Sequence, residues 1–225
     1  MKVIYEDNHI IIVAKDSGEI VQGDKTGDTP LSDTVKAYLK EKYHKPGAVF
    51  LGVVHRLDRP VSGLVVFART SKALSRLNRM FAEGEVHKTY WAIVGNNSPQ
   101  VPDVSLLTHW LVRNEKQNKS YAYDHEVPHS KKAMLRYHTI GHSDHYQLLE
   151  VELLTGRHHQ IRCQLAKAGM PIKGDLKYGA PRSNADGSIS LVSRRIEFVH
   201  PVSKETITAE APIPEDSLWQ AIVPR

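Results

Sequence analysis

A charged segment, His55–Leu64, lies between two apolar runs, and this pattern constrains the fold more than any other part of the chain. The flanking runs at 53–54 and 64–68 are rich in β-branched residues, which is typical of buried strands. The segment between them carries one carboxylate, Asp58, placed between two arginines. A charged loop held between core strands is where a rigid scaffold presents reactive groups. The pattern therefore predicts two core strands joined by a functional loop.

Asp58 is the candidate nucleophile of this loop. The neighbouring cations, Arg56 and Arg59, favour the ionised carboxylate even when it is partly removed from water. An ion pair with a purely structural role explains the same residues, because such pairs also perturb carboxylates. The segment alone leaves both interpretations open.

Length and charge indicate the class of protein. A chain of 225 residues is long enough to bury a full core, and its net charge of +5 suggests an anionic partner. No apolar run approaches the length of a membrane span, and the first residues lack the apolar core of a secretory signal. The single cysteine, Cys163, excludes an internal disulfide. We therefore expect a cytoplasmic protein.

The remaining patterns predict many strands and few helices. Apolar periodicity predicts helices over 30–43 and 71–82, the first of them capped by Ser32 or Asp33. Strands are expected at 3–5, 10–14, 88–94, 134–140, 146–154, 188–192 and 196–200. Residues 96–132 are polar and predict short strands and loops. Because strands and helices do not alternate strictly, we expect one α+β domain over 1–225, with a mainly antiparallel central sheet.

A second dense motif, Leu154–Arg162, follows a predicted strand and opens a short helix that ends near Gly169. Its helix N-terminus favours anions and is surrounded by basic side chains. These side chains are Arg157, His158, His159 and Arg162. The arrangement predicts a site for a phosphate, or for a carboxylate such as Asp58. Adjacent histidines point in different directions on a helix, so we do not expect them to bind a metal.

Together these motifs resemble those of the RluA-type family of RNA pseudouridine synthases. The resemblance rests on His55–Gly63, Lys88–Tyr90 and Leu154–Arg162, and it continues through 171–179 and 198–201. It implies the α+β fold of that family and the isomerisation of uridine to pseudouridine in rRNA or tRNA. The reaction breaks the N1–C1′ bond, rotates the base and joins C5 to C1′. No electron or phosphoryl group is transferred, so no cofactor or metal is expected.

The resemblance also implies roles for individual residues. Asp58 stands at the position of the catalytic aspartate, Arg162 at that of its arginine partner, and Tyr90 at that of the tyrosine that stacks on the target base. Arg56 matches a residue that helps to hold the nucleotide out of the RNA stack. The further motif positions expected to bind substrate or shape the pocket are His55, Arg59, Lys88, Arg157, Gln160 and Ile161.

The chain departs from the family pattern at a few positions. Residues 14–18, Ala-Lys-Asp-Ser-Gly, replace the usual Asn-Lys-Pro-x-Gly, and Cys163 stands where a histidine is common. Residues 191–193 replace the usual Leu-His-Ala. The sequence begins directly with the catalytic domain, so we expect RNA to bind to the domain's own basic surface. One candidate stripe, equally explained as a solvated face, consists of Lys116, Lys119, Lys131, Lys132 and Arg136.

Two other classes of protein compete with this interpretation. A non-catalytic RNA-binding protein on the same fold is disfavoured because Asp58, Tyr90 and Arg162 are all present. A glycoside hydrolase needs a second carboxylate at a defined separation, and none accompanies Asp58 in these motifs. The sequence therefore favours a monomeric pseudouridine synthase without an obligate protein partner. It leaves open whether Asp58 attacks C1′ or acts as a base on the sugar.

Overall fold

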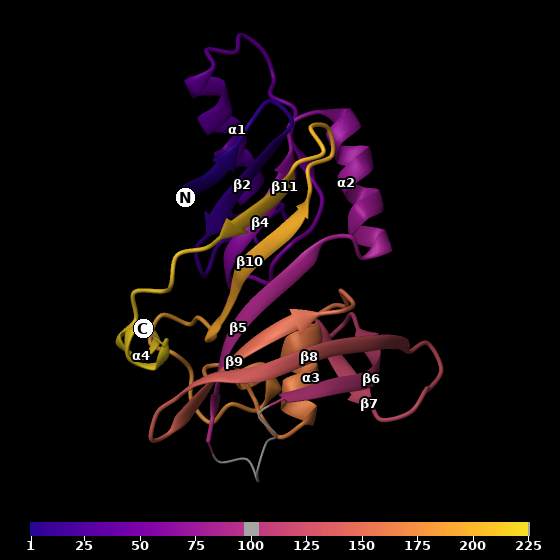
Figure 1. Ribbon diagram of the computed structural model, residues 1–225, viewed down its shortest axis with the longest axis vertical. Helices are drawn as coiled ribbons and strands as arrows, with labels where there is room; N and C mark the ends of the chain where they lie inside the picture. Colours follow the sequence, from indigo (N-terminus) through magenta and orange to yellow (C-terminus); the bar gives the residue numbers. More distant parts are fainter. Residues whose placement is uncertain (97–103, 225) are drawn as a thin grey trace. The chain divides into compact units, whose positions relative to one another are not determined.

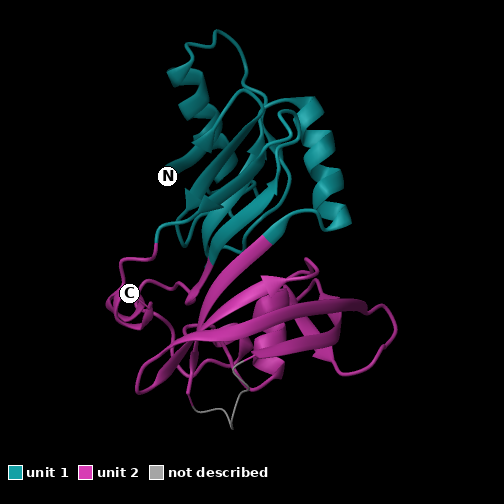
Figure 2. Ribbon diagram, viewed as in Figure 1, with its two compact units in different colours: residues 1–87, 193–212 teal, residues 88–192, 213–225 magenta. Residues whose placement is uncertain are grey.

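The computed structural model describes residues 1–96 and 104–224. The chain forms two compact units, shown in Figure 2. Unit 1 contains residues 1–87 and 193–212, and unit 2 contains residues 88–192 and 213–225. Within the described residues, no helix is both long and apolar enough to cross a membrane. The assignment of 1–225 to a single catalytic domain stays a prediction.

Unit 1 is a sheet with two helices (Figure 1), in which the pairs β1–β2, β2–β4, β3–β4 and β10–β11 are antiparallel. The sheet order is β1 (Lys2–Glu6), β2 (Ile10–Lys15), β4 (Ser62–Ala68) and β10 (Leu191–Val199), with β3 (Gly52–Val53) on β4 and β11 (Thr206–Glu210) on β10. Strands β2 and β4 pair from Ile10 opposite Ala68 to Lys15 opposite Gly63. Because nearly all residues of both strands are buried, this pair forms the centre of the unit's core.

The two helices of unit 1 begin in different ways. Helix α2 (Ser71–Glu83) has the side chain of Thr70 as its N-cap and ends at Gly84, which is in the left-handed conformation. Helix α1 (Leu31–Lys42) has no side-chain cap, so the predicted cap by Ser32 or Asp33 is wrong. The N–H groups of residues 31 and 32 donate instead to the backbone carbonyls of residues 20 and 21. The preceding backbone thus satisfies the donors that a cap would serve.

Unit 2 is built on a long antiparallel sheet. Its strand order is β5 (His87–Gly95), β9 (Tyr146–Leu153), β8 (Lys131–His142), β6 (Val104–Asn114) and β7 (Lys119–Tyr123). Helix α3 (Gln160–Lys167) packs against β6 and β7. A 3₁₀ turn, η1 (Leu176–Tyr178), follows it, and α4 (Ser217–Ile222) lies near the end of the described chain. These pairings confirm the predicted α+β class with antiparallel sheet.

The structure departs from the predicted elements mainly in three places. The polar stretch 96–132 contains the eleven-residue strand β6, and its residues 97–103 lie outside the described part. The two strands predicted over 188–200 are one continuous strand, β10, in which Ser193 is buried. Strand β11 and helix α4 were not predicted. In β6 and β10, buried polar residues such as His109 and Ser193 interrupt the apolar pattern from which strands are predicted.

Candidate functional site

The Asp58 loop connects β3 to β4 in unit 1, as the sequence predicts. Leu57 is buried, whereas Asp58 is half-buried. The backbone N–H of Val61 donates to the carbonyl of Asp58 at 3.0 Å, which closes a turn over residues 58–61. The carboxylate is therefore carried by a tight turn that is anchored next to the core strand β4.

The segment Lys15–Gly18 donates hydrogen bonds to the backbone carbonyls of this turn. The ammonium of Lys15 donates to the carbonyls of Arg59 at 3.1 Å and Val61 at 2.7 Å, and its side chain is almost wholly buried. The N–H of Gly18 donates to the Arg59 carbonyl at 2.8 Å, and the Ser17 hydroxyl donates to the Pro60 carbonyl at 3.2 Å. Although residues 14–18 depart from the family pattern, this segment is hydrogen-bonded to the Asp58 loop.

Burial lowers the pKa of Lys15 to about 8. The nearby carboxylates of Glu19, Asp58 and Asp16 act in the opposite direction and offset part of this effect. The ammonium is thus a buried positive charge close to the Asp58 carboxylate. At neutral pH the charged ammonium orders the loop through its hydrogen bonds to the loop carbonyls.

Gly63 is required by close packing where β4 begins. Its φ is +113°, and a Cβ at this position would lie within 3.0 Å of the Ser193 backbone, closer than real Cβ contacts come. Glycine is therefore the residue that lets β10 approach β4 next to the Asp58 loop. This explains the Ser-Gly pair that follows the loop in the sequence.

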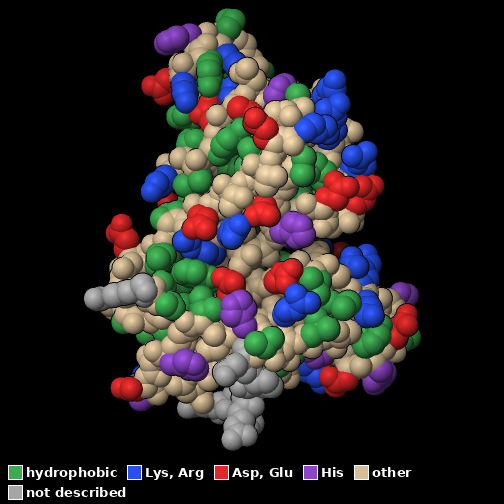
Figure 3. All heavy atoms as spheres, viewed as in Figure 1, with side chains coloured by type: hydrophobic (Ala, Val, Ile, Leu, Met, Phe, Trp, Pro, Cys, Tyr) green, Lys and Arg blue, Asp and Glu red, His purple; other side chains and the backbone are tan. Residues whose placement is uncertain are grey.

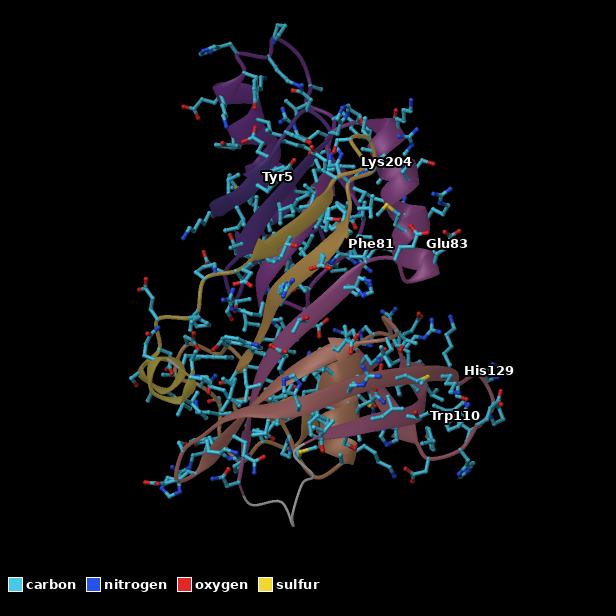
Figure 4. All side chains as sticks on the ribbon, viewed as in Figure 1. Tyr5, Phe81, Glu83, Trp110, His129 and Lys204 are labelled. Carbon is cyan, nitrogen blue, oxygen red and sulfur yellow. The ribbon has the colours of Figure 1, made fainter. Side chains whose placement is uncertain are left out.

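The other predicted residues of this loop differ in their surroundings. His55 accepts a hydrogen bond at Nε2 from the Val66 N–H at 2.9 Å, and its ring stacks on Phe81, which is labelled in Figure 4. His55 thereby anchors the start of the loop to β4. Arg56 and Arg59 are exposed, and Arg59 forms an ion pair with Asp28. Contacts of these three residues with RNA stay predictions.

Arg162, on helix α3 of unit 2, is held by a carboxylate that sequence reasoning did not single out. Its Nε and Nη2 donate to the two carboxylate oxygens of Asp175, at 2.7 and 2.9 Å. Arg162 is 5% exposed and Asp175 is 1% exposed, so this is a bidentate ion pair in the protein interior. The pairing of Arg162 with Asp58 stays a prediction.

The aromatic ring of Tyr178 completes the surroundings of Arg162. The guanidinium carbon lies 5.1 Å from the ring centroid, a cation–π distance. The Tyr178 hydroxyl accepts from the Ser120 N–H at 2.8 Å and is hydrogen-bonded to Nδ1 of His159 at 2.9 Å. Asp175 and Tyr178 both come from the segment 171–179, a cationic, glycine-rich loop that belongs to the family resemblance but for which the sequence predicted no site residue.

The basic cluster predicted at the start of α3 carries less charge than its sequence suggests. Burial and the nearby Arg162 lower the pKa of His159 to about 2, so this histidine is neutral. His159 and His158 stack with ring centroids 3.8 Å apart, and His158 is hydrogen-bonded to Ser120 and Asn118. Both histidines therefore have protein partners that account for their positions. Arg157 is exposed and donates to the Lys132 carbonyl at 3.1 Å.

The remaining predicted residues of unit 2 lie in buried or half-buried positions. Tyr90 is 7% exposed on β5, where it pairs with Val151, and Lys88 is half-buried, which lowers its pKa. Gln160 and Ile161 are buried at the start of α3. The amide of Gln160 accepts from Thr155 and donates to the Met134 carbonyl, so it braces the turn before the helix.

Comparison with known proteins identifies the family. The sequence profile described as RNA pseudouridylate synthase matches residues 9–167. "Ribosomal large subunit pseudouridine synthase D" of Xanthomonas campestris is 32% identical over 96% of this chain and 67% of its own length. "Ribosomal large subunit pseudouridine synthase C" of Vibrio vulnificus is 30% identical over 95% of this chain and 66% of its own length. The chain thus spans about two thirds of the length of these relatives.

Solved structures show the same fold. Human RNA pseudouridylate synthase domain containing 4 has a TM-score of 0.79 at 19% identity, covering 97% of this chain and 90% of that one. Human RNA pseudouridylate synthase domain containing 1 has a TM-score of 0.73 at 20% identity, covering 100% and 88%. None of these matches supports the alternative of a non-catalytic RNA-binding protein. The chain belongs to the RNA pseudouridylate synthase family, the isomerases that convert uridine to pseudouridine in RNA.

Proposed function

We propose that this protein isomerises specific uridines of ribosomal RNA to pseudouridine, with Asp58 as the catalytic residue. The observation that carries the proposal is the family match over residues 9–167, which includes every residue of the predicted catalytic set. The ordered loop in unit 1 supports it, since a catalytic carboxylate must be held in one position. Asp58 either attacks C1′ or acts as a base on the sugar, and both routes need the ionised carboxylate.

Tyr90 and Arg162 complete the proposed catalytic set. The target base must leave the RNA stack before its glycosidic bond can rearrange, and an aromatic side chain replaces part of the lost stacking, about 1–3 kcal/mol per base. Tyr90 is proposed for that role, and Arg56 is proposed to help hold the extruded nucleotide. Arg162 is proposed as the partner of the Asp58 carboxylate. The ion pair with Asp175 supports this, because it fixes the guanidinium in the protein interior.

The proposed substrate follows from the relatives. Two of them are named as synthases for the large ribosomal subunit, and both match nearly the whole of this chain. We therefore place large-subunit rRNA ahead of tRNA. A cytoplasmic location follows from that substrate. The state of a monomer without an obligate protein partner stays a prediction from the sequence.

Tritium release from RNA labelled at uridine C5 tests the proposal, because that hydrogen leaves only when C5 forms the new glycosidic bond. The RNA comes from cells that lack this protein, and ribosomal RNA and tRNA are assayed separately. We expect release from rRNA by the wild type and none by Asp58→Asn, with RNA binding retained. Asp33→Asn, which changes an exposed carboxylate on α1, is the matched control and should keep full activity. Turnover by Asp58→Asn would remove Asp58 as the catalyst.

A further inference from the structure

Helix α2 and the turn between β10 and β11 line a pocket of about 290 Å³ within unit 1. Two arginines of α2, Arg76 and Arg79, and one lysine of the turn, Lys204, contribute its cations. Figure 3 shows basic side chains gathered over α2, and Figure 4 labels Lys204 beside that helix. Val199 and Pro201 belong to the family motif at 198–201, but none of the residues predicted to catalyse the reaction or bind substrate lines this pocket. It is therefore a basic site outside the predicted catalytic set.

A direct bond joins the two walls of the pocket. Nη1 of Arg76 donates to the carbonyl of Pro201 at 2.6 Å and so ties α2 to the β10–β11 turn. This bond occupies one of the five N–H donors of the guanidinium. Arg76 is partly buried, and its charge is thereby fixed at the wall rather than extended into solvent. A fixed arginine loses less conformational entropy when it binds an anion than a mobile one does.

The turn that carries Lys204 is ordered by a buried histidine. Nδ1 of His200 accepts from the N–H groups of Val202 and Ser203, at 3.2 and 2.8 Å. Nε2 of His200 lies 2.9 Å from the Asp7 carboxylate. The N–H of Lys204 in turn donates to the His200 carbonyl, and Lys204 has a φ of +68°. A lysine in this conformation costs more than a glycine would, so the turn presents the cation at the expense of backbone strain.

The balance of charge at the pocket favours an anion. Three cations line it against one carboxylate, that of Glu85. Arg79 also faces Glu83 at 3.6 Å, but these side chains are 64% and 53% exposed. An ion pair this exposed is weak and exchanges readily with a phosphate. The pocket also has apolar wall residues, including Met80 and the 47% exposed Val199.

We propose that this pocket binds a ribose–phosphate segment of the substrate RNA, outside the target uridine. The proposal rests on the proposed function, which supplies an RNA substrate. Arginine presents planar, paired donors that match phosphate oxygens, and the apolar wall suits the face of a ribose. One phosphate held by exposed cations binds weakly, whereas a polymer brings further phosphates and releases condensed counterions. RNA is therefore favoured over a free anion as the occupant.

The test removes two charges and leaves the structural Arg76 in place. Arg79→Gln/Lys204→Gln is compared with Lys40→Gln/Lys45→Gln, which removes two exposed cations from another part of unit 1. The probe is unmodified large-subunit ribosomal RNA transcribed in vitro. We expect the pocket variant to bind about tenfold more weakly, with a log–log salt slope shallower by roughly 1.4 for two lost phosphate contacts. Its tritium release at saturating RNA should equal that of the wild type.

A third variant gives an effect of opposite sign, which misfolding cannot imitate. Glu85→Gln removes the carboxylate that lines the pocket and should tighten RNA binding by about two- to threefold. Inorganic phosphate, titrated alone, tests the small anion as the alternative occupant. Measurable phosphate binding together with unchanged RNA affinity in all variants would overturn the proposal in favour of a free anion.

The outcomes for the pocket and for the proposed function are separate. Equal affinity and equal salt slope in the pocket variant and its control would overturn the pocket proposal, while tritium release by the wild type would still support the proposed function. No release by the wild type, with weakened RNA binding in the pocket variant, would overturn the proposed function. The pocket would then stand as an RNA-binding site of a protein with another activity.

Discussion

Replacing Lys15 by methionine tests how the Asp58 loop is held in place. The substitution keeps the length and apolar stem of the side chain but removes three hydrogen bonds, to the carbonyls of Asp16, Arg59 and Val61. Leaving a buried carbonyl without a donor costs about 1–3 kcal/mol. The Arg59 carbonyl keeps its bond from the Gly18 N–H, so about two carbonyls lose their donor. The lost bonds alone therefore lower the free energy of unfolding by about 2–6 kcal/mol.

Removing the buried charge offsets part of this loss of stability at neutral pH, because the folded wild type must keep an ammonium out of water. The pKa of Lys15 falls from 10.5 to about 8 on folding, so the unfolded chain binds more protons between these values. The free energy of unfolding of the wild type therefore rises with pH between these two values and reaches its full value above them. From pH 7 to pH 10 this rise amounts to about 2–3 kcal/mol. Lys15→Met lacks it, so the variant should be mildly destabilised at pH 7 and clearly more so at pH 10.

Urea unfolding of both proteins at the two pH values measures this difference, and tritium release measures the effect on the loop. Lys40→Met, which changes an exposed lysine on α1, is the matched control. Its free energy of unfolding should differ from that of the wild type by the same amount at both pH values. We also expect Lys15→Met to lose activity at pH 7, because the turn that carries Asp58 loses its buried support. If the difference in the free energy of unfolding between the wild type and Lys15→Met were the same at both pH values, the assigned burial of the ammonium would be refuted. Full activity in a stable variant would refute its role in positioning the loop.

Two further substitutions test close packing and the interior ion pair. Gly63→Ala should destabilise unit 1 by more than about 2 kcal/mol, because the new Cβ meets the Ser193 backbone, whereas Gly23→Ala meets no atom within 4 Å and should melt like the wild type. Equal melting temperatures for both variants would contradict the close approach of β10. Asp175→Asn should cost about 3 kcal/mol or more and reduce turnover, because the buried Arg162 loses its charged partner. The exposed Asp144→Asn is its control, and a chemical denaturation midpoint unchanged in Asp175→Asn would show that the pair contributes little.

The sequence predicted the elements whose pattern is local and failed where long-range contacts decide. The hairpin of β1 and β2, helix α2 and the Asp58 loop each carry their own signal, an apolar period or a turn residue. The long strand β6 lies in a stretch for which the sequence predicts only short strands and loops, because His109 and other polar residues interrupt its alternation. In the structure His109 is buried and bonded to Gln164, a residue far away in the sequence. No local pattern reveals such a partner.

The candidate site shows the same division. The charged loop singled out Asp58, the basic start of a helix singled out Arg162, and the family motifs then gave each a role. The residues that hold them, Lys15 and Asp175, lie in the segments 14–18 and 171–179, for which the sequence predicted no bonding partner. Their roles depend on a buried ammonium meeting loop carbonyls and on a carboxylate that reaches helix α3 from a following loop. Sequence reasoning names the groups that carry chemistry more readily than the groups that hold them in place.

The discontinuous make-up of unit 1 has a consequence for synthesis on the ribosome. Strand β4 ends at Ala68, but its sheet neighbour β10 begins only at Leu191. At about 5–20 residues per second, this neighbour is made roughly 6–25 s later. During that interval an apolar strand edge lacks its final partner, which invites pairing with other chains. We therefore expect slower translation of the middle of the chain to raise aggregation, and early access of a holdase chaperone to raise the yield of folded protein.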